Sequence, residues 1–164
     1  MWLVGMMGSG KTTVGEAVAN RMEVPFFDTD SMVAEMARLP IPAIWDGVGE
    51  EGFRRLENEV VATIPESDAV VAAGGGAVLS KQNRERMTRG GFVVWLRCSP
   101  ESLAKRIGEQ GDRPLLENAD VPGTLARILE QRAPLYEQVA THIIDTEHRS
   151  IEDVVSEVVE VWEQ

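Results

Sequence analysis

The sequence predicts an α/β protein of three layers, with a five-stranded parallel sheet between two layers of helices. Short apolar runs alternate with longer stretches of helical periodicity, which is the order expected of βαβ units. Each run is continuously apolar, as is typical of strands that helices cover on both faces. The predicted strands are residues 2–4, 24–27, 69–73, 92–96 and 143–144.

Helices are predicted over residues 12–22, 31–39, 55–64, 80–88, 99–107, 121–139 and 150–162. Two of the starts carry N-cap signals, because Ser99 precedes a proline and Ser150 stands three residues before Asp153. In the last helix, apolar residues from Ile151 to Trp162 recur at the spacing of one face, which we interpret as core packing. The stretches 39–52 and 108–122, rich in Gly, Pro and charge, are predicted to be mobile segments that could act as lids.

Length and composition favour one folded domain over residues 1–164, with 43% apolar and 26% charged residues. A net charge of -11 argues against a nucleic-acid partner, because phosphate binding on that scale needs clustered Lys and Arg. No apolar run approaches the ~20 residues of a membrane helix and no signal peptide is evident, so we expect a cytoplasmic protein with no membrane partner. Cys98 is the one cysteine, and we expect a buried thiol.

Residues 5–12 match G-x-x-x-x-G-K-[ST] in full, directly after an apolar strand and directly before a helix. In such a P-loop, backbone N–H groups at a helix N-terminus face the phosphates. Lys11 adds positive charge, and the Thr12 hydroxyl is placed to ligate a Mg²⁺ that bridges phosphate oxygens. We therefore expect ATP or GTP with magnesium. The chain has no N-K-x-D motif, and the D-x-x-G at residues 46–49 follows no strand, so a GTPase is disfavoured.

Two carboxylates, Asp28 and Asp30, follow the second predicted strand, where ligands bind in open α/β sheets. If the strand persists, their spacing turns both the same way. One could hold the magnesium shell through water, and the other could accept a hydroxyl proton from a phosphate acceptor. The alternative is that Asp30 only caps the helix that begins near Ser31.

Three further segments carry residues suited to an anionic substrate. Arg54 and Glu57 could pair, which would hold a guanidinium fork ready for a carboxylate, although a solvated helix face is the alternative. The glycines at 74–76 indicate close approach of backbone to a ligand rather than a plain turn. Arg113 stands in a predicted mobile stretch from which it could reach transferring phosphates, and Arg132 is another cationic anchor.

Taken in order, these segments resemble the shikimate kinase family of small P-loop kinases nearly end to end. The motifs are G-x-x-x-x-G-K-T, F-D-x-D, G-F-R-R-x-E, G-G-G-A, R-P-L-L and R-A-P-L-Y. The resemblance implies the P-loop fold shared with nucleoside monophosphate kinases, with a shikimate-binding segment near 31–63 and a lid near 108–122. It also implies a monomer that uses Mg²⁺ and transfers the γ-phosphoryl group of ATP to the 3-hydroxyl of shikimate, a step of chorismate and aromatic amino-acid synthesis.

The resemblance also implies roles for single residues. Arg54 and Arg132 would grip the shikimate carboxylate, with Glu57 orienting Arg54. Asp30 would bind substrate hydroxyls and be the candidate base, so that the implied catalytic residues are Lys11, Asp30 and Arg113. The implied metal residues are Thr12 directly and Asp28 in the outer shell. The implied nucleotide-binding residues are Gly8, Ser9, Gly10, Lys11, Thr12, Thr13, Arg106, Arg113 and Arg149. The implied substrate-binding residues are Asp30, Arg54, Glu57, Gly75, Gly76 and Arg132.

One position departs from the family pattern and two alternatives stay open. Trp45 stands where the family commonly has a smaller aromatic, and it could pack on the substrate or belong to the local core. A related gluconate or nucleoside monophosphate kinase would share the loop and lid, but the G-G-G-A and R-A-P-L-Y segments argue against both. A nucleotide-binding regulatory domain without transfer activity is opposed by Lys11, Asp30 and Arg113.

Overall fold

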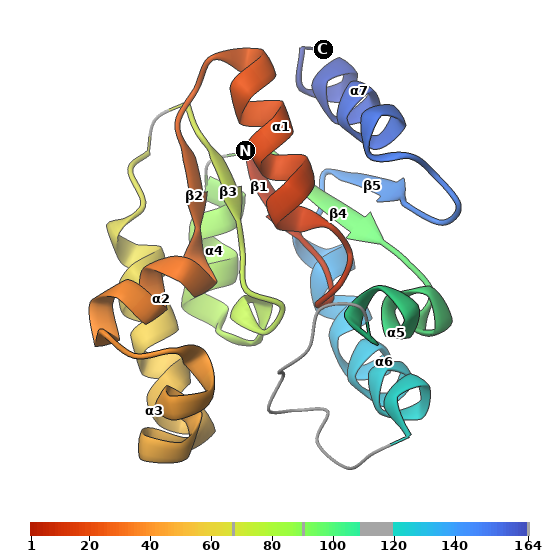
Figure 1. Ribbon diagram of the computed structural model, residues 1–164. Helices are drawn as coiled ribbons and strands as arrows, with labels where there is room; N and C mark the ends of the chain where they lie inside the picture. Colours follow the sequence, from red (N-terminus) through yellow and green to blue (C-terminus); the bar gives the residue numbers. More distant parts are fainter. Residues whose placement is uncertain (67, 90, 109–119, 164) are drawn as a thin grey trace.

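The five strands form one parallel sheet, as predicted, and the structure gives their order as β2-β3-β1-β4-β5 (Figure 1). The computed structural model describes residues 1–66, 68–89, 91–108 and 120–163. Each strand lies within a few residues of its predicted range. The strands are β1 (Trp2–Val4), β2 (Phe26–Asp28), β3 (Val70–Ala72), β4 (Val93–Arg97) and β5 (His142–Asp145).

The sheet order brings three connections to one edge. In the registers, Leu3 of the central strand β1 pairs with Ala72, and Ala72 pairs in turn with Asp28. The carboxyl ends of β1, β2 and β3 therefore lie side by side, and ligands of open α/β sheets bind at that edge. Three groups of candidate site residues stand at these ends. The glycines of residues 5–10 follow β1, the glycines of 74–76 follow β3, and Asp28 is the last residue of β2.

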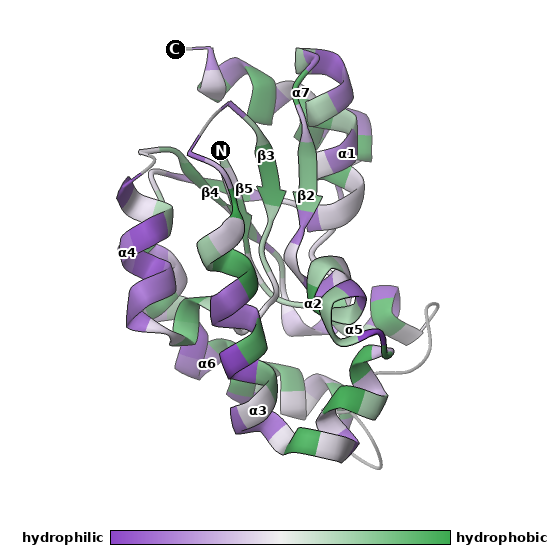
Figure 2. Cartoon of the chain, turned by 90° about the vertical axis from the view of Figure 1, so that its left-hand side faces the viewer, coloured by the Kyte–Doolittle hydropathy of each residue, from purple (hydrophilic) through white to green (hydrophobic). Residues whose placement is uncertain are grey.

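Helices cover both faces of the sheet, because its strands are apolar on both (Figure 2). The core against α1 and α7 includes Leu3, Val18 and Val158, whereas the core on the other face includes Met87 and Tyr136 from α4 and α6. A third, smaller cluster joins α2 to α3. The helical elements are α1 (Lys11–Met22), α2 (Thr29–Ala37), α3 (Ile41–Thr63), η1 (Ala77–Leu79), α4 (Lys81–Arg89), α5 (Pro100–Gly108), α6 (Val121–Val139) and α7 (Ile151–Trp162).

Most of the predicted mobile stretch 39–52 is helical, because α3 begins at Ile41 and not at the predicted residue 55. Pro40 is its N-cap residue and a second proline lies in the first turn, where a missing N–H costs no helical hydrogen bond. Only Gly49 departs from helical geometry inside α3, with φ 68° and ψ -177°. Apolar residues of this stretch bury themselves against α2, which is why it is helical. Of the predicted stretch 108–122, residues 109–119 lie outside the described part of the chain.

Smaller predictions divide into confirmed and wrong ones. Ser150 caps α7 by accepting from Asp153 N–H at 3.1 Å, and the Cys98 thiol is buried, both as predicted. Ile151, however, is 54% exposed and does not join the core face of α7.

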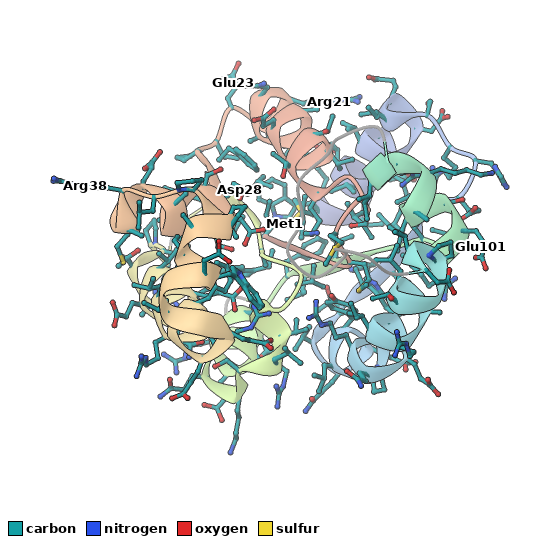
Figure 3. The ribbon with its side chains drawn as sticks, turned by 60° about the horizontal axis from the view of Figure 1, so that its bottom comes forward. Met1, Arg21, Glu23, Asp28, Arg38 and Glu101 are labelled. Carbon is teal, nitrogen blue, oxygen red and sulfur yellow. The ribbon has the colours of Figure 1, made fainter. Side chains whose placement is uncertain are left out.

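No described helix is long and apolar enough to span a membrane. Charged side chains such as Glu23 and Arg38 extend outward from the helices (Figure 3).

Candidate active site

The loop between β1 and α1 has the backbone of a P-loop. Gly5, Gly8 and Gly10 have φ of 145°, 78° and 93°, which L side chains rarely adopt. A side chain at Gly5 would also lie 2.6 Å from the Leu96 carbonyl oxygen. The glycines therefore fix the path that leads into the N-terminus of α1, where the helix dipole favours an anion.

Lys11 and Thr12 are the first two residues of α1, and both are held by neighbours. The Lys11 ammonium donates to the Met6 carbonyl oxygen at 2.9 Å. The Thr12 hydroxyl donates to Asp28 Oδ2 at 2.7 Å. Since Asp28 ends β2, this contact ties the P-loop to a strand that lies beyond β3 in the sheet.

The strand does not persist through both carboxylates, so the condition for their common direction is not met. The strand ends at Asp28 and α2 begins at Thr29, so Asp28 and Asp30 do not project as two residues of one strand. The helix cap is Asp28 rather than Asp30, because Asp28 Oδ1 accepts from the N–H groups of Asp30 at 3.0 Å and Ser31 at 3.1 Å. The cap fixes the backbone of Asp30 directly.

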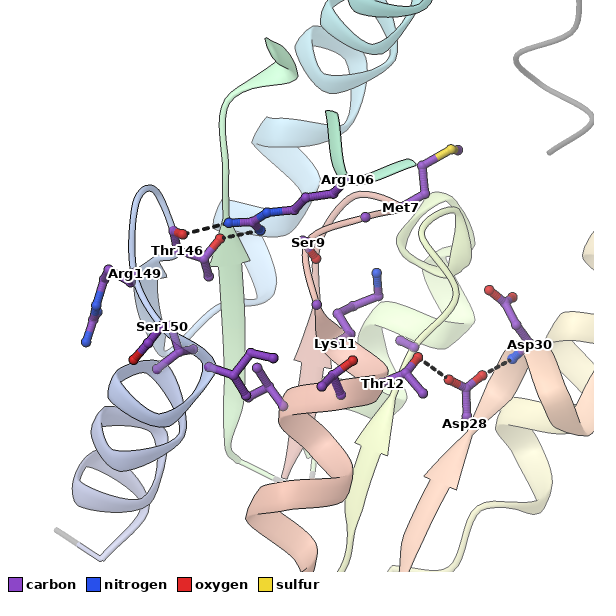
Figure 4. Close-up of a pocket in the computed structure, with 17 residues that line it drawn as sticks. Met7, Ser9, Lys11, Thr12, Asp28, Asp30, Arg106, Thr146, Arg149 and Ser150 are labelled. Carbon is purple, nitrogen blue, oxygen red and sulfur yellow. Dashed lines mark hydrogen bonds between the residues drawn. The ribbon is translucent and has the colours of Figure 1, made fainter. Parts of the chain in front are cut away.

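A cleft of about 570 Å³ lies along the P-loop (Figure 4). It brings together predicted residues from four distant parts of the chain, including Asp30, Arg106 and Arg149. It also includes Thr146 and Ile151, which the sequence does not assign to a site. The sequence places Ile151 on the apolar face of the last helix, directly after the N-cap, but as a core residue. The lining residues are Met7, Gly8, Ser9, Gly10, Lys11, Thr12, Thr13, Val14, Asp28, Asp30, Ala73, Arg106, Thr146, Arg149, Ser150, Ile151 and Val154.

The two arginines of the cleft are both anchored. Arg106 on α5 donates to Thr146 Oγ1 at 3.2 Å and to the Thr146 carbonyl oxygen at 2.8 Å. Arg149 donates to the carbonyl oxygens of Asp145 and Asp153 and pairs with Glu157, so its guanidinium is tied to both ends of the β5–α7 connection. Figure 4 shows the Arg149 side chain extending away from the P-loop.

A second group of charged residues surrounds the glycines at 74–76. Arg54 pairs with Glu57 at 2.9 Å, and the Glu57 side chain is only 1% exposed. Burial raises the pKa of Glu57, and the attraction of the Arg54 guanidinium opposes that rise. The predicted pair therefore exists, and the alternative of a solvated helix face is wrong.

The glycines are needed because side chains approach them closely. A Cβ at Gly74 would stand 2.5 Å from Asp30 Oδ1 and 2.7 Å from Glu57 Oε1, and a Cβ at Gly76 would overlap the Arg54 guanidinium. The expectation was close approach of backbone to a ligand. Within the described structure, the close approach is that of Asp30, Glu57 and Arg54 to this backbone.

Arg132 approaches the same glycines from α6, whereas Arg54 and Glu57 approach them from α3. Its side chain is buried, and a Cβ at Gly75 would stand 3.7 Å from Arg132 Nη1. One turn later, the Tyr136 hydroxyl donates to the Gly75 carbonyl oxygen at 2.5 Å. Burial raises the pKa of Tyr136 to about 12, so the phenol stays protonated and remains a donor.

Trp45 belongs to the same neighbourhood. Its ring lies 5.3 Å from that of Phe53, and the Arg54 guanidinium lies 5.7 Å from the Trp45 centroid. Trp45 therefore packs locally against Phe53 and Arg54 and is partly buried in the cluster between α2 and α3. The resemblance assigns Asp30, Arg54, Glu57 and Arg132 to the substrate. Of these four, only Asp30 lines the cleft. Arg113 lies outside the described residues.

A parallel sheet of this order, with a P-loop after its central strand, defines the class of P-loop kinases. A gluconokinase from Sinorhizobium meliloti shares the fold at 20% identity, with a TM-score of 0.63 over 97% of this chain and 89% of that one. The shikimate kinase family model matches residues 7–163. The chain belongs to the shikimate kinase family.

Close relatives agree with this assignment. A shikimate kinase of Symbiobacterium thermophilum is 48% identical over 161 residues, which cover 96% of this chain and 92% of the relative. The solved structure of a shikimate kinase from Acinetobacter baumannii in complex with shikimate matches with a TM-score of 0.94 at 34% identity. That match covers 99% of this chain and 91% of the other.

Proposed function

We propose that this enzyme transfers the γ-phosphoryl group of ATP, bound in the 570 Å³ cleft, to the 3-hydroxyl of shikimate, bound beside Asp30. The reaction yields ADP and shikimate 3-phosphate, on the route to chorismate and the aromatic amino acids. One observation carries the proposal: Asp30 lines the nucleotide cleft and also stands beside Gly74 together with Glu57. Donor and acceptor sites meet at this carboxylate.

The nucleotide side is supported by the donors around the P-loop. Backbone N–H groups from Gly8 to Thr13 and the ammonium of Lys11 face the phosphates in this proposal. A loose phosphoryl-transfer transition state needs positioning and positive charge more than covalent chemistry. Arg106 and Arg149 contribute to the base end of the site, and Arg113 contributes charge near the transferring group.

Magnesium fits the oxygen donors at Thr12 and Asp28, which are the hydroxyl and carboxylate types that this ion prefers. The described residues contain no group of three or more His, Cys, Asp or Glu side chains that could hold a metal by themselves. Thr12 would therefore bind the ion together with nucleotide phosphates and water, and Asp28 would orient that water. When bound, the ion supplies positive charge at the phosphate oxygens.

The acceptor side is supported by two arginines and two unsatisfied buried atoms. Arg54 and Arg132 approach residues 74–76 from α3 and α6, and two guanidinium groups suit one carboxylate. Arg54 Nε and Glu57 Oε1 are buried and have no hydrogen-bond partner among the described residues. Buried polar atoms need partners, and a substrate that carries a carboxylate and hydroxyl groups supplies both kinds. Residues 31–63 thus form the substrate-binding segment.

The enzyme acts as a monomer in this proposal, because one chain supplies the residues for both substrates. We also propose a cytoplasmic location. Sedimentation equilibrium of the purified protein, with and without both substrates, tests the monomer. A mass near 18.0 kDa is the expected result.

The experiment that tests the reaction is ADP formation from Mg-ATP, measured with and without shikimate and with gluconate and AMP as parallel acceptors. Turnover with shikimate alone supports the proposal. Turnover with gluconate or AMP in its place would contradict the acceptor, and tight ATP binding without turnover on any of them would contradict the transferase role.

A further inference from the structure

The connection between β5 and α7 is fastened to the start of α5 by one carboxylate. Glu147 Oε2 accepts hydrogen bonds from the Ser99 N–H at 3.0 Å and from the Cys98 thiol at 3.4 Å. Its other oxygen, Oε1, accepts from the hydroxyls of Ser99 at 3.2 Å and Ser102. Four donors from residues 98–102 thus converge on a side chain that lies more than 40 residues away in the sequence.

A second set of hydrogen bonds joins the same connection to the end of α5. Arg106, near the last turn of α5, donates to both the hydroxyl and the carbonyl oxygen of Thr146, the residue before Glu147 (Figure 4). Thr146 is 3% exposed, and its hydroxyl donates to the Arg97 carbonyl oxygen at 3.1 Å. Arg106 and Thr146 line the cleft, whereas Glu147 does not.

Glu147 carries a negative charge close to the proposed nucleotide site. Hydrogen bonds from the Ser102 hydroxyl and the Ser99 N–H lower the pKa of Glu147 to about 2, so the carboxylate stays ionised at neutral pH. Among the described residues, the basic side chain near this carboxylate is that of His148, at 3.7 Å, which is 88% exposed and forms an ion pair with it only when the imidazole is protonated. A negative charge beside a site for a polyanion disfavours nucleotide binding. A favourable effect of Glu147 on nucleotide binding must therefore come through the residues that Glu147 holds in place.

We propose that Glu147 is a positioning residue of the nucleotide site. By clamping the connection onto α5, it fixes Thr146 and, through Thr146, the Arg106 guanidinium against the cleft. Glu147 thereby sets the affinity for the nucleotide without touching it. The inference rests on the proposed function only in that it places ATP in this cleft.

Calorimetric titration with Mg-ADP tests the proposal, because it needs no turnover. Glu147→Ala removes all four acceptor contacts, and we expect the Kd for Mg-ADP to rise about tenfold. The KM for shikimate and kcat at saturating ATP should change by less than about twofold, since Arg54 and Arg132 do not contact this connection. Glu147→Gln should rescue most of the loss, because an amide of the same length accepts from the Ser99 N–H while the serine hydroxyls turn to accept from it.

Glu152→Ala is the matched control. Glu152 lies in the first turn of α7, next to Ile151; it is exposed and pairs with Arg21 of α1, and among the described residues it makes no hydrogen bond or ion pair with α5. Removing either carboxylate takes one negative charge from the neighbourhood of the nucleotide, and that effect alone tightens binding. We therefore expect the Kd to stay unchanged or to fall in the control, and to rise only where the clamp is lost.

Ser102→Ala removes one contact from the α5 side and provides the second variant if Glu147→Ala does not fold. It should raise the Kd about twofold to threefold, and its effect should not add to that of Glu147→Ala. A Kd for Mg-ADP that is unchanged or lower in folded Glu147→Ala and Ser102→Ala proteins would overturn the positioning role alone. A parent protein that binds Mg-ADP but does not phosphorylate shikimate would overturn the proposed function alone.

Discussion

The Thr12 hydroxyl donates a 2.7 Å hydrogen bond to Asp28, and this contact connects the start of α1 to the start of α2. The second oxygen of Asp28 accepts from the Asp30 N–H. A single carboxylate therefore fixes both the Thr12 hydroxyl, which is proposed to bind magnesium, and the backbone of Asp30, which is proposed to bind the acceptor. Such a shared support holds the two halves of the site at a fixed separation, which phosphoryl transfer requires.

Asp30→Asn should lower kcat about 100-fold or more, because an amide neither accepts the hydroxyl proton nor carries charge. The affinity for Mg-ATP should not fall, since the proposed nucleotide contacts come from other residues and the change removes a negative charge from the cleft. Steady-state kinetics with calorimetric ATP binding measure both. Asp46→Asn, an exposed position on α3, is the control. A variant with near-normal kcat would remove Asp30 from catalysis.

Gly76→Ala should raise the KM for shikimate about tenfold while the protein still folds. The new Cβ overlaps the end of the Arg54 side chain, which can move away but then leaves Glu57 and the acceptor site. Gly47→Ala is the matched control, because nothing lies within 4 Å of a Cβ at that position. Equal KM values for the two variants would show that the place of Arg54 is unimportant for the acceptor.

Tyr136→Phe should lower the free energy of unfolding by about 1–2 kcal/mol, because the partly buried Gly75 carbonyl oxygen loses the donor that the buried Tyr136 hydroxyl supplies. The ring itself is unchanged and keeps its contact with Trp95. The KM for shikimate should also rise, since Gly75 and Arg132 lose a common support. Urea denaturation and kinetics measure the two effects, and wild-type values for both would contradict the role of this hydrogen bond.

Glu57→Gln should gain stability relative to the parent protein as the pH rises. Burial raises the pKa of Glu57 above its usual value of 4.5, so between those two values the folded state binds more protons than the unfolded state. The contribution of Glu57 to stability is complete below the usual pKa and is lost as the pH rises through the raised one. Urea denaturation from about pH 5 to about pH 8 measures the difference, and a constant difference would contradict the expectation.

The sequence predicted the phosphate loop and its place in the fold. The P-loop lies where the motif placed it, because glycine geometry, the lysine and the helix start are encoded within eight consecutive residues. The five parallel strands were also predictable, because each strand is encoded by its own run of consecutive apolar residues. The shikimate kinase family was also recognisable, because the order of its motifs is a property of the chain.

What failed were predictions that depended on contacts between distant segments. The stretch 39–52 has the Pro and Gly content of a loop, but burial of Ile44 and Phe53 against α2 makes most of it helical. Ile151 has the periodicity of a core residue, but it stands at the end of α7 that opens on the cleft.

The sequence by itself determined the local elements, the phosphate loop and the family of this protein. Only the tertiary structure decided that Asp30, Glu57 and Arg54 converge on the glycines after β3, and that Glu147 clamps α5. The physical reason is that local patterns set the conformation of neighbouring residues, whereas the sheet order β2-β3-β1-β4-β5 decides which loops meet. That order depends on how all the apolar faces of the chain are buried together.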